Sequence, residues 1–170
     1  PGITSFSQVI SNFMPIEYDT SDEEMNQAFF AAVDFCFSHL DRMKRRHHYT
    51  IECRAAVKKA MIQGNQALIF EESLPWLENF FDLGGDVHPA QFVIMPSSGN
   101  WKLRAIPPSL ADRMKVRKAL PEEWAGLHEQ DLKEVCGIKG AIFCHKGRFI
   151  SIWETKEDAL KALHIALGSK

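Results

Sequence analysis

A change in residue pattern near position 65 constrains the fold of this 170-residue chain more than any other feature. Before that position, apolar residues recur at intervals of three and four, which is the spacing of amphipathic helices. After it, short segments rich in β-branched, aromatic and aliphatic residues alternate with Gly, Pro, Ser and Asn, which is typical of strands joined by turns. The sequence therefore predicts helices first and a sheet afterwards.

Two long helices are predicted in the first part of the chain. Ser21 followed by Glu24 is a capping-box pattern, and the helix behind it is expected to end at about Arg46. We expect its apolar stripe to be buried against other apolar elements. The stripe consists of Met25, Phe29, Ala32, Cys36, Leu40 and Met43. Thr50 is expected to cap a second helix that continues to Ile62.

Five strands are predicted in the second part, over residues 66–70, 91–95, 101–106, 141–144 and 149–153. Turn residues at 97–100 and 146–147 lie where hairpins would form, so two pairings should be antiparallel. Helical spacing is also present at 74–83, at 121–135 and after Thr155. The predicted fold is α+β: a single domain, residues 1–170, with a mostly antiparallel or mixed five-stranded sheet and helices packed on it.

Composition excludes several classes of protein. The net charge is −2, so the chain does not bind nucleic acid by bulk charge, and no apolar run approaches the roughly 20 residues of a membrane span. Neither a phosphate-binding P-loop nor a Gly-x-Ser-x-Gly nucleophile motif is present. The four cysteines form no Cys-x-x-Cys pair, which predicts reduced thiols and a cytoplasmic location.

Three small clusters of reactive residues have simpler interpretations. His47 and His48 are helical neighbours about 100° apart, so they are poorly placed to share one metal ion. Asp86 and His88 lack a third ligand nearby and suit a turn before a strand. Cys144 and the adjacent His145 should face opposite sides of a sheet, so they do not form a catalytic pair. We predict neither a metal site nor a catalytic residue in this chain.

Local basic stretches are the more informative feature. Residues 102–118 carry six cations against one carboxylate, and residues 139–148 carry three cations and no acid. Cations beside exposed aromatic faces are what a single-stranded nucleic acid requires. The candidate substrate-binding residues are Trp101, Arg104, Arg117, Lys118, His145, Lys146 and Arg148. The simpler alternative is that the aromatic side chains belong to the core and the cations are solvated.

Four motifs in the second half of the chain resemble one known family. They are Gly99–Pro107, Leu120–Leu127, Cys136–His145 and Thr155–Leu160. Their order and content resemble the C-terminal half of the melanocyte-proliferating-gene (Myg) family, which belongs to the DHH phosphoesterase superfamily. The helices before position 64 are compatible with the same family.

The resemblance implies a metal-dependent phosphoesterase with RNA exonuclease activity in the eukaryotic members. In that family the metal, which we expect to be manganese, lies in an N-terminal catalytic DHH lobe that this chain does not contain. The chain is then the substrate-binding lobe, inactive alone, and its expected partners are the catalytic lobe and single-stranded RNA or a phosphorylated small molecule. The alternative is a non-catalytic protein-interaction or dimerisation module.

Overall fold

The structure is a computed structural model that describes residues 4–63 and 66–168. The chain divides into two compact units, Pro1–Tyr49 and Thr50–Lys170, and each is described by itself. The prediction of one folding domain therefore stays a prediction. Among the described helices, none is long and apolar enough to cross a membrane.

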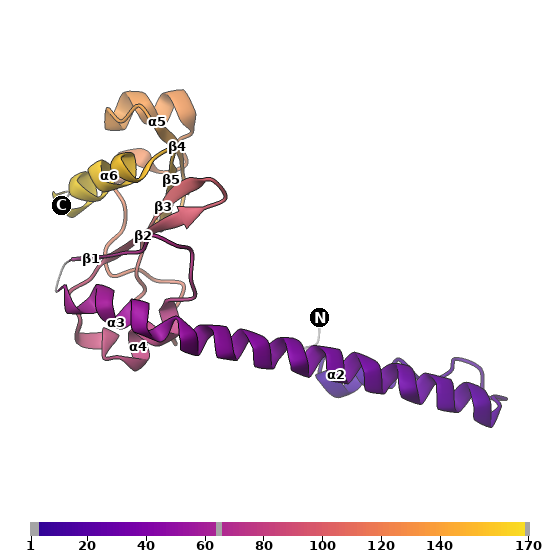
Figure 1. Ribbon diagram of the computed structural model, residues 1–170. Coiled ribbons are helices and arrows are strands. Elements are labelled where there is room, and N and C mark those ends of the chain that lie inside the picture. Colours follow the sequence, from indigo (N-terminus) through magenta and orange to yellow (C-terminus); the bar gives the residue numbers. More distant parts are fainter. Residues whose placement is uncertain (1–3, 64–65, 169–170) are drawn as a thin grey trace. The chain divides into compact units, whose positions relative to one another are not determined.

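The first unit contains α1 (Phe6–Ser11) and most of α2 (Asp22–Glu52), as Figure 1 shows. The predicted capping box is present, because the Glu24 amide donates to the Ser21 hydroxyl and the Ser21 amide donates to the Glu24 carboxylate. The short α1 was not predicted. α1 and the turn after it pack on α2 through aromatic rings, with Phe6 of α1 at 4.9 Å from His39 and Phe13 of the turn at 5.3 Å from Phe35.

The predicted boundary between the two long helices is wrong, although the second one does end at Ile62. The first helix does not end near Arg46 but continues to Glu52, so Thr50 lies inside it rather than capping a second helix. Only Cys53 separates it from the next helix, α3 (Arg54–Ile62). The reason is that no glycine or proline lies between Arg46 and Arg54, so the charge-rich segment continues the helix.

The prediction that the α2 stripe is buried is also wrong. Phe29 is 61% exposed and Leu40 is 58% exposed, and no residue of α2 is fully buried. Helical periodicity identifies an apolar face but does not identify what covers it. In the described part of the first unit only the six-residue α1 packs on α2, and it covers the side that carries Phe35.

Replacing Phe29 with alanine should therefore change the free energy of unfolding by less than about 0.5 kcal/mol, since little apolar area is lost. A buried phenylalanine would cost about 3–5 kcal/mol. Urea denaturation of both proteins checks this at a concentration low enough to exclude association. A loss of several kcal/mol would show that Phe29 is packed in the isolated chain.

All five predicted strands are confirmed, and they form one mixed sheet in the order β1-β2-β3-β5-β4. The strands are β1 (Ala67–Ile69), β2 (Phe92–Ser97), β3 (Asn100–Ala105), β4 (Ala141–Cys144) and β5 (Ile150–Trp153). Only β1 and β2 are parallel, and the other three pairings are antiparallel. The predicted turn between β2 and β3 is present, with Ser98 and Gly99 both at positive φ, as a tight hairpin requires.

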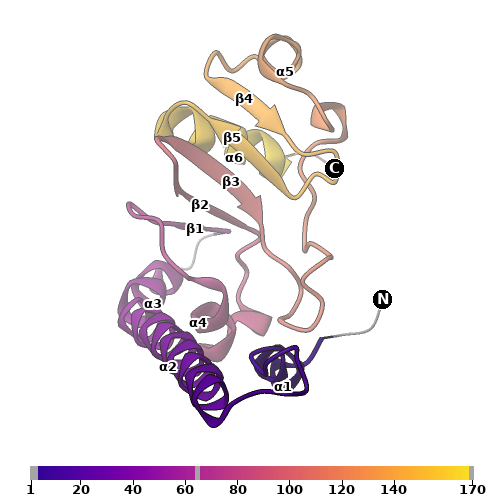
Figure 2. The ribbon, with the colours of Figure 1, turned by 90° about the vertical axis from the view of Figure 1, so that its right-hand side faces the viewer.

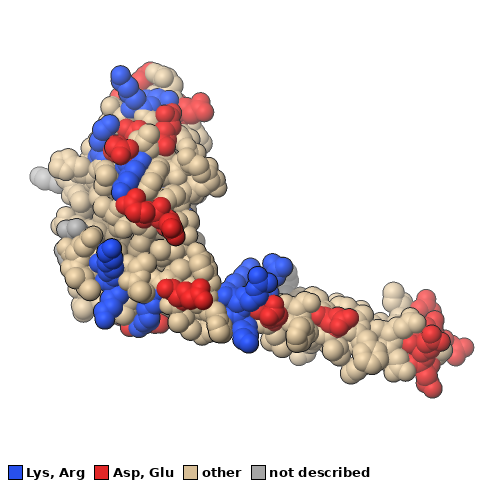
Figure 3. Space-filling view, in the orientation of Figure 1, with Lys and Arg blue, Asp and Glu red and all other residues tan. Residues whose placement is uncertain are grey.

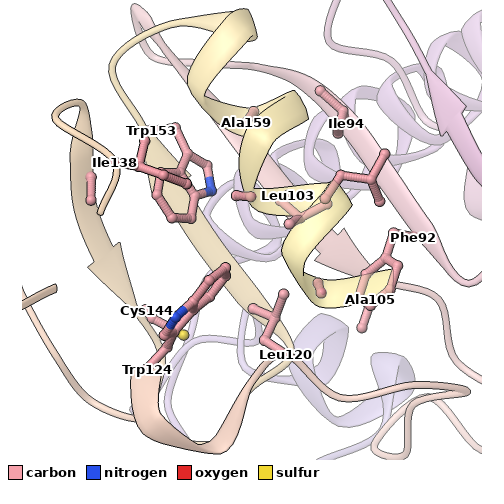
Figure 4. Close-up of a cluster of buried hydrophobic side chains, with 14 of the residues drawn as sticks. Phe92, Ile94, Leu103, Ala105, Leu120, Trp124, Ile138, Cys144, Trp153 and Ala159 are labelled. Carbon is pink, nitrogen blue, oxygen red and sulfur yellow. The ribbon is translucent and has the colours of Figure 1, made fainter. Parts of the chain in front are cut away.

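The sheet has a different cover on each face. One face packs against α6 (Lys156–Gly168) and α5 (Glu129–Cys136), and Figure 4 shows its core around Trp124 and Trp153, whose rings meet edge to face at 5.6 Å. On the other face α3 and α4 (Leu77–Asp82) pack against β1 and β2. This second layer contains Val93 and Met95, and it ends at β2.

Two of the later helices are shorter than predicted. The segment 121–135 is not one helix but a 3-10 turn, η2 (Glu122–Trp124), followed by α5. Gly126 has φ 76° between them, which breaks a right-handed helix. The segment 74–83 forms α4 only from Leu77, after Pro75, and a further 3-10 turn, η1 (Gly85–Val87), follows it. Thr155 does cap α6, since its hydroxyl accepts from the Asp158 amide.

Candidate functional site

The candidate site is the part of the second sheet face that no described helix of the second unit covers. Residues paired across neighbouring strands share a face of the sheet. Lys102 pairs with Ile152, which pairs with Phe143, and Arg104 pairs with Ile150. These residues therefore form two rows across β3, β5 and β4, which we call the open face. Figure 2 looks onto it, with α6 behind the sheet.

The edge of the open face is set by the second layer. Val93 is the cross-strand neighbour of Arg104, and Met95 is the neighbour of Lys102. Val93 and Met95 are buried under α3 and α4, whereas the two cations on β3 are only half-buried. On this side of the sheet, β2 therefore carries apolar side chains under the helices, and the next strand, β3, carries Lys102 and Arg104 where the helical cover ends.

The charge on the open face is not neutralised within the described part of the chain. Neither Lys102 nor Arg104 forms an ion pair with any described carboxylate. Partial burial, and then the neighbouring charge of Arg104, lower the pKa of Lys102 below its usual value. A bound anion would relieve this repulsion, so the two side chains form a place where a phosphate group is favoured.

The β4–β5 hairpin turn brings more donors to one end of the open face. The Gly147 amide donates to Nδ1 of His145 at 2.9 Å, so in the neutral ring the proton lies on Nε2. A Cβ on Gly147 would lie 3.2 Å from that same Nδ1, so the close approach favours glycine. Lys146 and Arg148 flank this glycine, and neither forms an ion pair with a described residue.

A row of flat rings runs from His128 along the β4–β5 hairpin. His145 is 4.4 Å from Phe149 and 6.2 Å from Phe143, and Phe143 is 4.8 Å from His128, all between ring centroids. Three of these residues are exposed, namely His128, His145 and Phe149, and Phe143 is half-buried. Such a row offers surfaces on which nucleic-acid bases stack. The open face can therefore bind an anion and hold a flat group beside it.

Sequence reasoning brought Arg104, His145, Lys146 and Arg148 into one candidate site. The structure places Arg104 and His145 on the open face. Lys146 and Arg148 lie in the turn between β4 and β5, where the charge of Arg148 also acts on the Cys144 thiol on the covered face.

Sequence reasoning did not include Lys102, Phe143 or His128 among the site residues. For Lys102 the signal was available, because it is two residues from Arg104 and strand alternation puts both on one face. For His128 there was none, since its contact with Phe143 is tertiary.

The side chains of the other three predicted site residues are used in contacts that hold the fold together. Trp101 is paired with Trp153 and lies on the opposite face, against the core. The Arg117 guanidinium donates to the backbone carbonyls of Gly85, His88, Ala90 and Pro107. Lys118 donates to the carbonyl of Leu167 at 2.8 Å, near the end of α6. In the folded chain the side chains of these three residues are engaged in contacts with the protein itself and not in the candidate site.

The smaller reactive clusters do not form a second site. Burial raises the pKa of the Cys144 thiol to about 12, so it is not an activated nucleophile. His88 is held by the Met61 carbonyl and the Ala90 amide. Across residues 4–63 and 66–168, no three His, Cys, Asp or Glu side chains are grouped to hold a metal ion.

Comparison with known proteins identifies relatives along the whole chain. The family model described as "Uncharacterised protein family (UPF0160)", named for a MYG1 exonuclease, matches residues 2–167. The MYG1 protein of Chlamydia pneumoniae is 43% identical over 99% of this chain and 58% of its own length. The MYG1 protein of Chlamydia trachomatis is 45% identical over 98% of this chain and 56% of its own length.

A more distant relative carries an activity in its name. The MYG1 exonuclease of Rattus norvegicus is 28% identical over 98% of this chain and 46% of its own length. No solved structure matches this chain. The chain spans little more than half the length of the chlamydial relatives. The family predicted from the four motifs is confirmed, and the chain belongs to the MYG1 exonuclease family.

Proposed function

We propose that this chain is the substrate-binding lobe of a metal-dependent phosphoesterase or RNA exonuclease of the DHH superfamily. The observation that carries the proposal is the pair of cations, Lys102 and Arg104, on an uncovered sheet face without a carboxylate to neutralise them among the described residues. These residues, with His145, Lys146 and Arg148, meet the phosphate backbone. The name of the rat relative supports a nuclease rather than another anion-binding protein.

The proposed catalytic metal, manganese, belongs to a separate N-terminal DHH lobe. The described residues of this chain do not fit such an ion, because they offer no group of three ligands. The chain's own contribution is therefore to hold and orient the substrate, and we propose that it does not hydrolyse phosphodiesters alone. The proposed location is the cytoplasm. The four cysteines are all free thiols in the structure, which supports a reducing, cytoplasmic location.

The proposed ligand is single-stranded RNA, with a phosphorylated small molecule as the smaller alternative. A single strand suits the open face because its bases can stack on Phe149 and His128 while its phosphates meet the cations. A small phosphorylated molecule would use the cations without the ring row. Replacing Phe149 with alanine therefore separates the two ligands, since only RNA binding should weaken.

Titration of a fluorescent 12-nucleotide RNA with the chain at several salt concentrations tests the proposal. Four phosphate contacts on a single strand give a log–log slope of about −3, because each contact releases about 0.7 counterion. A polyanion without bases, such as polyphosphate, should bind more weakly at equal charge. RNA binding that is absent, or that does not change with salt, would contradict the proposed function and favour the protein-interaction alternative.

The affinity for a phosphate ligand should fall as the pH rises through the lowered pKa of Lys102. Binding favours the charged ammonium, so it is strongest below that pKa and is lost above it, beginning at a pH lower than the ordinary lysine value of about 10.4. Titrations of a 2′-O-methyl oligonucleotide between pH 7 and pH 10 check this. Changing Lys102 to arginine should remove the part of this loss that comes from Lys102, and a profile unchanged by the substitution would remove Lys102 from the site.

A further inference from the structure

The exposed apolar band along α2 is the largest feature that the proposed function does not use. Seven large side chains between positions 25 and 43 are 39–73% exposed. They are Met25, Phe29, Phe30, Val33, Phe37, Leu40 and Met43. Soluble proteins rarely expose a contiguous apolar surface of this kind unless another molecule covers it. The band belongs to the first unit, whereas the residues of the open face belong to the second.

The spacing of the band is that of a coiled-coil seam. Phe30, Val33, Phe37 and Leu40 are separated by three, four and three residues, so they line one side of the helix. Phe29, Cys36 and Met43 recur every seven residues along one edge of that line. The ring of Phe35, which contacts α1, lies on the opposite side of α2 from the line Phe30–Leu40 by helical geometry. Residues of α1 and the turn after it line a pocket with Met25 and Phe29 at the edge of the band, so α1 borders the band but leaves the central line open.

Charge along α2 is distributed unequally. The first turn carries Asp22, Glu23 and Glu24, whereas Arg42, Lys44, Arg45 and Arg46 lie about six turns later. Figure 3 shows acidic side chains gathered at the first end of this helix and basic ones further along it. A parallel pair of these helices would place acid beside acid and base beside base. An antiparallel pair places the acidic end of each helix beside the basic segment of the other.

We propose that α2 pairs with α2 of a second copy of this chain in antiparallel orientation, related by a twofold axis near residue 35. The contacting positions are then Phe30 with Leu40, Val33 with Phe37, Asn26 with Lys44 and Glu23 with His47 of the second copy. The apolar layers lie at the centre and polar layers lie at both ends. The surface is self-complementary, as a closed dimer requires.

The same geometry has one unfavourable contact. Asp34 lies at the edge of the seam opposite to Cys36, so the Asp34 carboxylates of the two copies flank the twofold axis. Like charges in this position oppose association. The pairing therefore predicts that changing Asp34 to asparagine tightens the dimer, whereas most surface changes would leave association unaltered.

Analytical ultracentrifugation of the 170-residue chain tests the proposal. The parent chain should show a concentration-dependent equilibrium between one and two copies. Phe37→Asp should raise the dissociation constant at least about 30-fold, since each dimer carries the change twice at its central layers. Met114→Ser removes another apolar side chain, 96% exposed, and should leave the equilibrium unchanged. Circular dichroism should be the same for all three, because Phe37 is exposed in the single copy.

Cross-linking tests the orientation. In a Cys36→Ser background, Asn26→Cys and Lys44→Cys in the same chain should give, after mild oxidation, linked peptides joining position 26 to position 44 of the other copy. Within one helix these two positions are about 27 Å apart and cannot link. A single copy at every concentration, an Asp34→Asn dimer no tighter than the parent, or links joining 26 to 26 would each overturn the proposal. RNA binding by the Phe37→Asp variant should persist, which keeps this test separate from that of the open face.

Discussion

Changing Lys102 and Arg104 together to alanine should weaken the binding of single-stranded RNA about 100-fold at low salt. Each side chain is half-buried and forms no ion pair among the described residues, so a phosphate would be its partner of opposite charge. A tenfold loss for each contact corresponds to about 1.4 kcal/mol, which is in the range of charge-assisted hydrogen bonds. The salt slope should also become about 1.4 units less steep, because two phosphate contacts are lost.

A matched control removes the same charge elsewhere. Lys58 and Lys59 are exposed on α3, which packs on the β1–β2 part of the sheet. Their double alanine variant should lose less than about threefold in affinity, through the long-range field alone. Equal losses in both double variants would show that binding depends on net charge and not on the open face. Unfolding by urea should be nearly the same for both double variants, since none of these four side chains forms an ion pair with a described residue.

Changing Arg117 to alanine should instead destabilise the fold, by about 3 kcal/mol. Its guanidinium donates to four backbone carbonyls from two separate segments, residues 85–90 and Pro107, and it also lies 5.3 Å from the Phe80 ring centroid. Burial lowers the pKa of Arg117, although the nearby Asp86 opposes the shift, but the side chain stays charged near neutrality. Removing it leaves carbonyls without their donor in a partly buried site.

The conservative variant identifies the cause. Lysine keeps the charge but has a single ammonium in place of the planar fork, so Arg117→Lys should recover less than half of the lost stability. Arg104→Ala is the comparison, and it should change the free energy of unfolding by less than about 0.5 kcal/mol. Urea denaturation measures all three. A harmless Arg117→Ala change would show that the carbonyls find other partners, and would return Arg117 to the candidate ligand-binding residues.

Local sequence patterns determined the strands and turns of this protein. The five strand segments and the hairpin residue Gly99 were located correctly because β-branched and apolar residues bounded by turn residues leave the backbone few alternatives. The same local logic placed Arg104 and His145 in one candidate site, since each lies in or beside a strand of a predicted hairpin that carries basic residues. Helix ends were predicted less well. The boundary between α2 and α3 depends on weak propensities, and no breaker residue marks it.

Tertiary structure alone decided which cations and rings face the open surface. Arg104 and Arg117 belong to the same basic stretch, but one lies on an uncovered strand face and the other is surrounded by carbonyls from distant residues. Strand alternation places Trp101 and Arg104 on opposite faces, but which face the helices cover depends on contacts between residues far apart in sequence. Likewise, periodicity made α2 amphipathic without specifying its partner. A local pattern fixes the direction of a side chain relative to its own backbone, whereas burial depends on what the rest of the chain, or another molecule, brings against it.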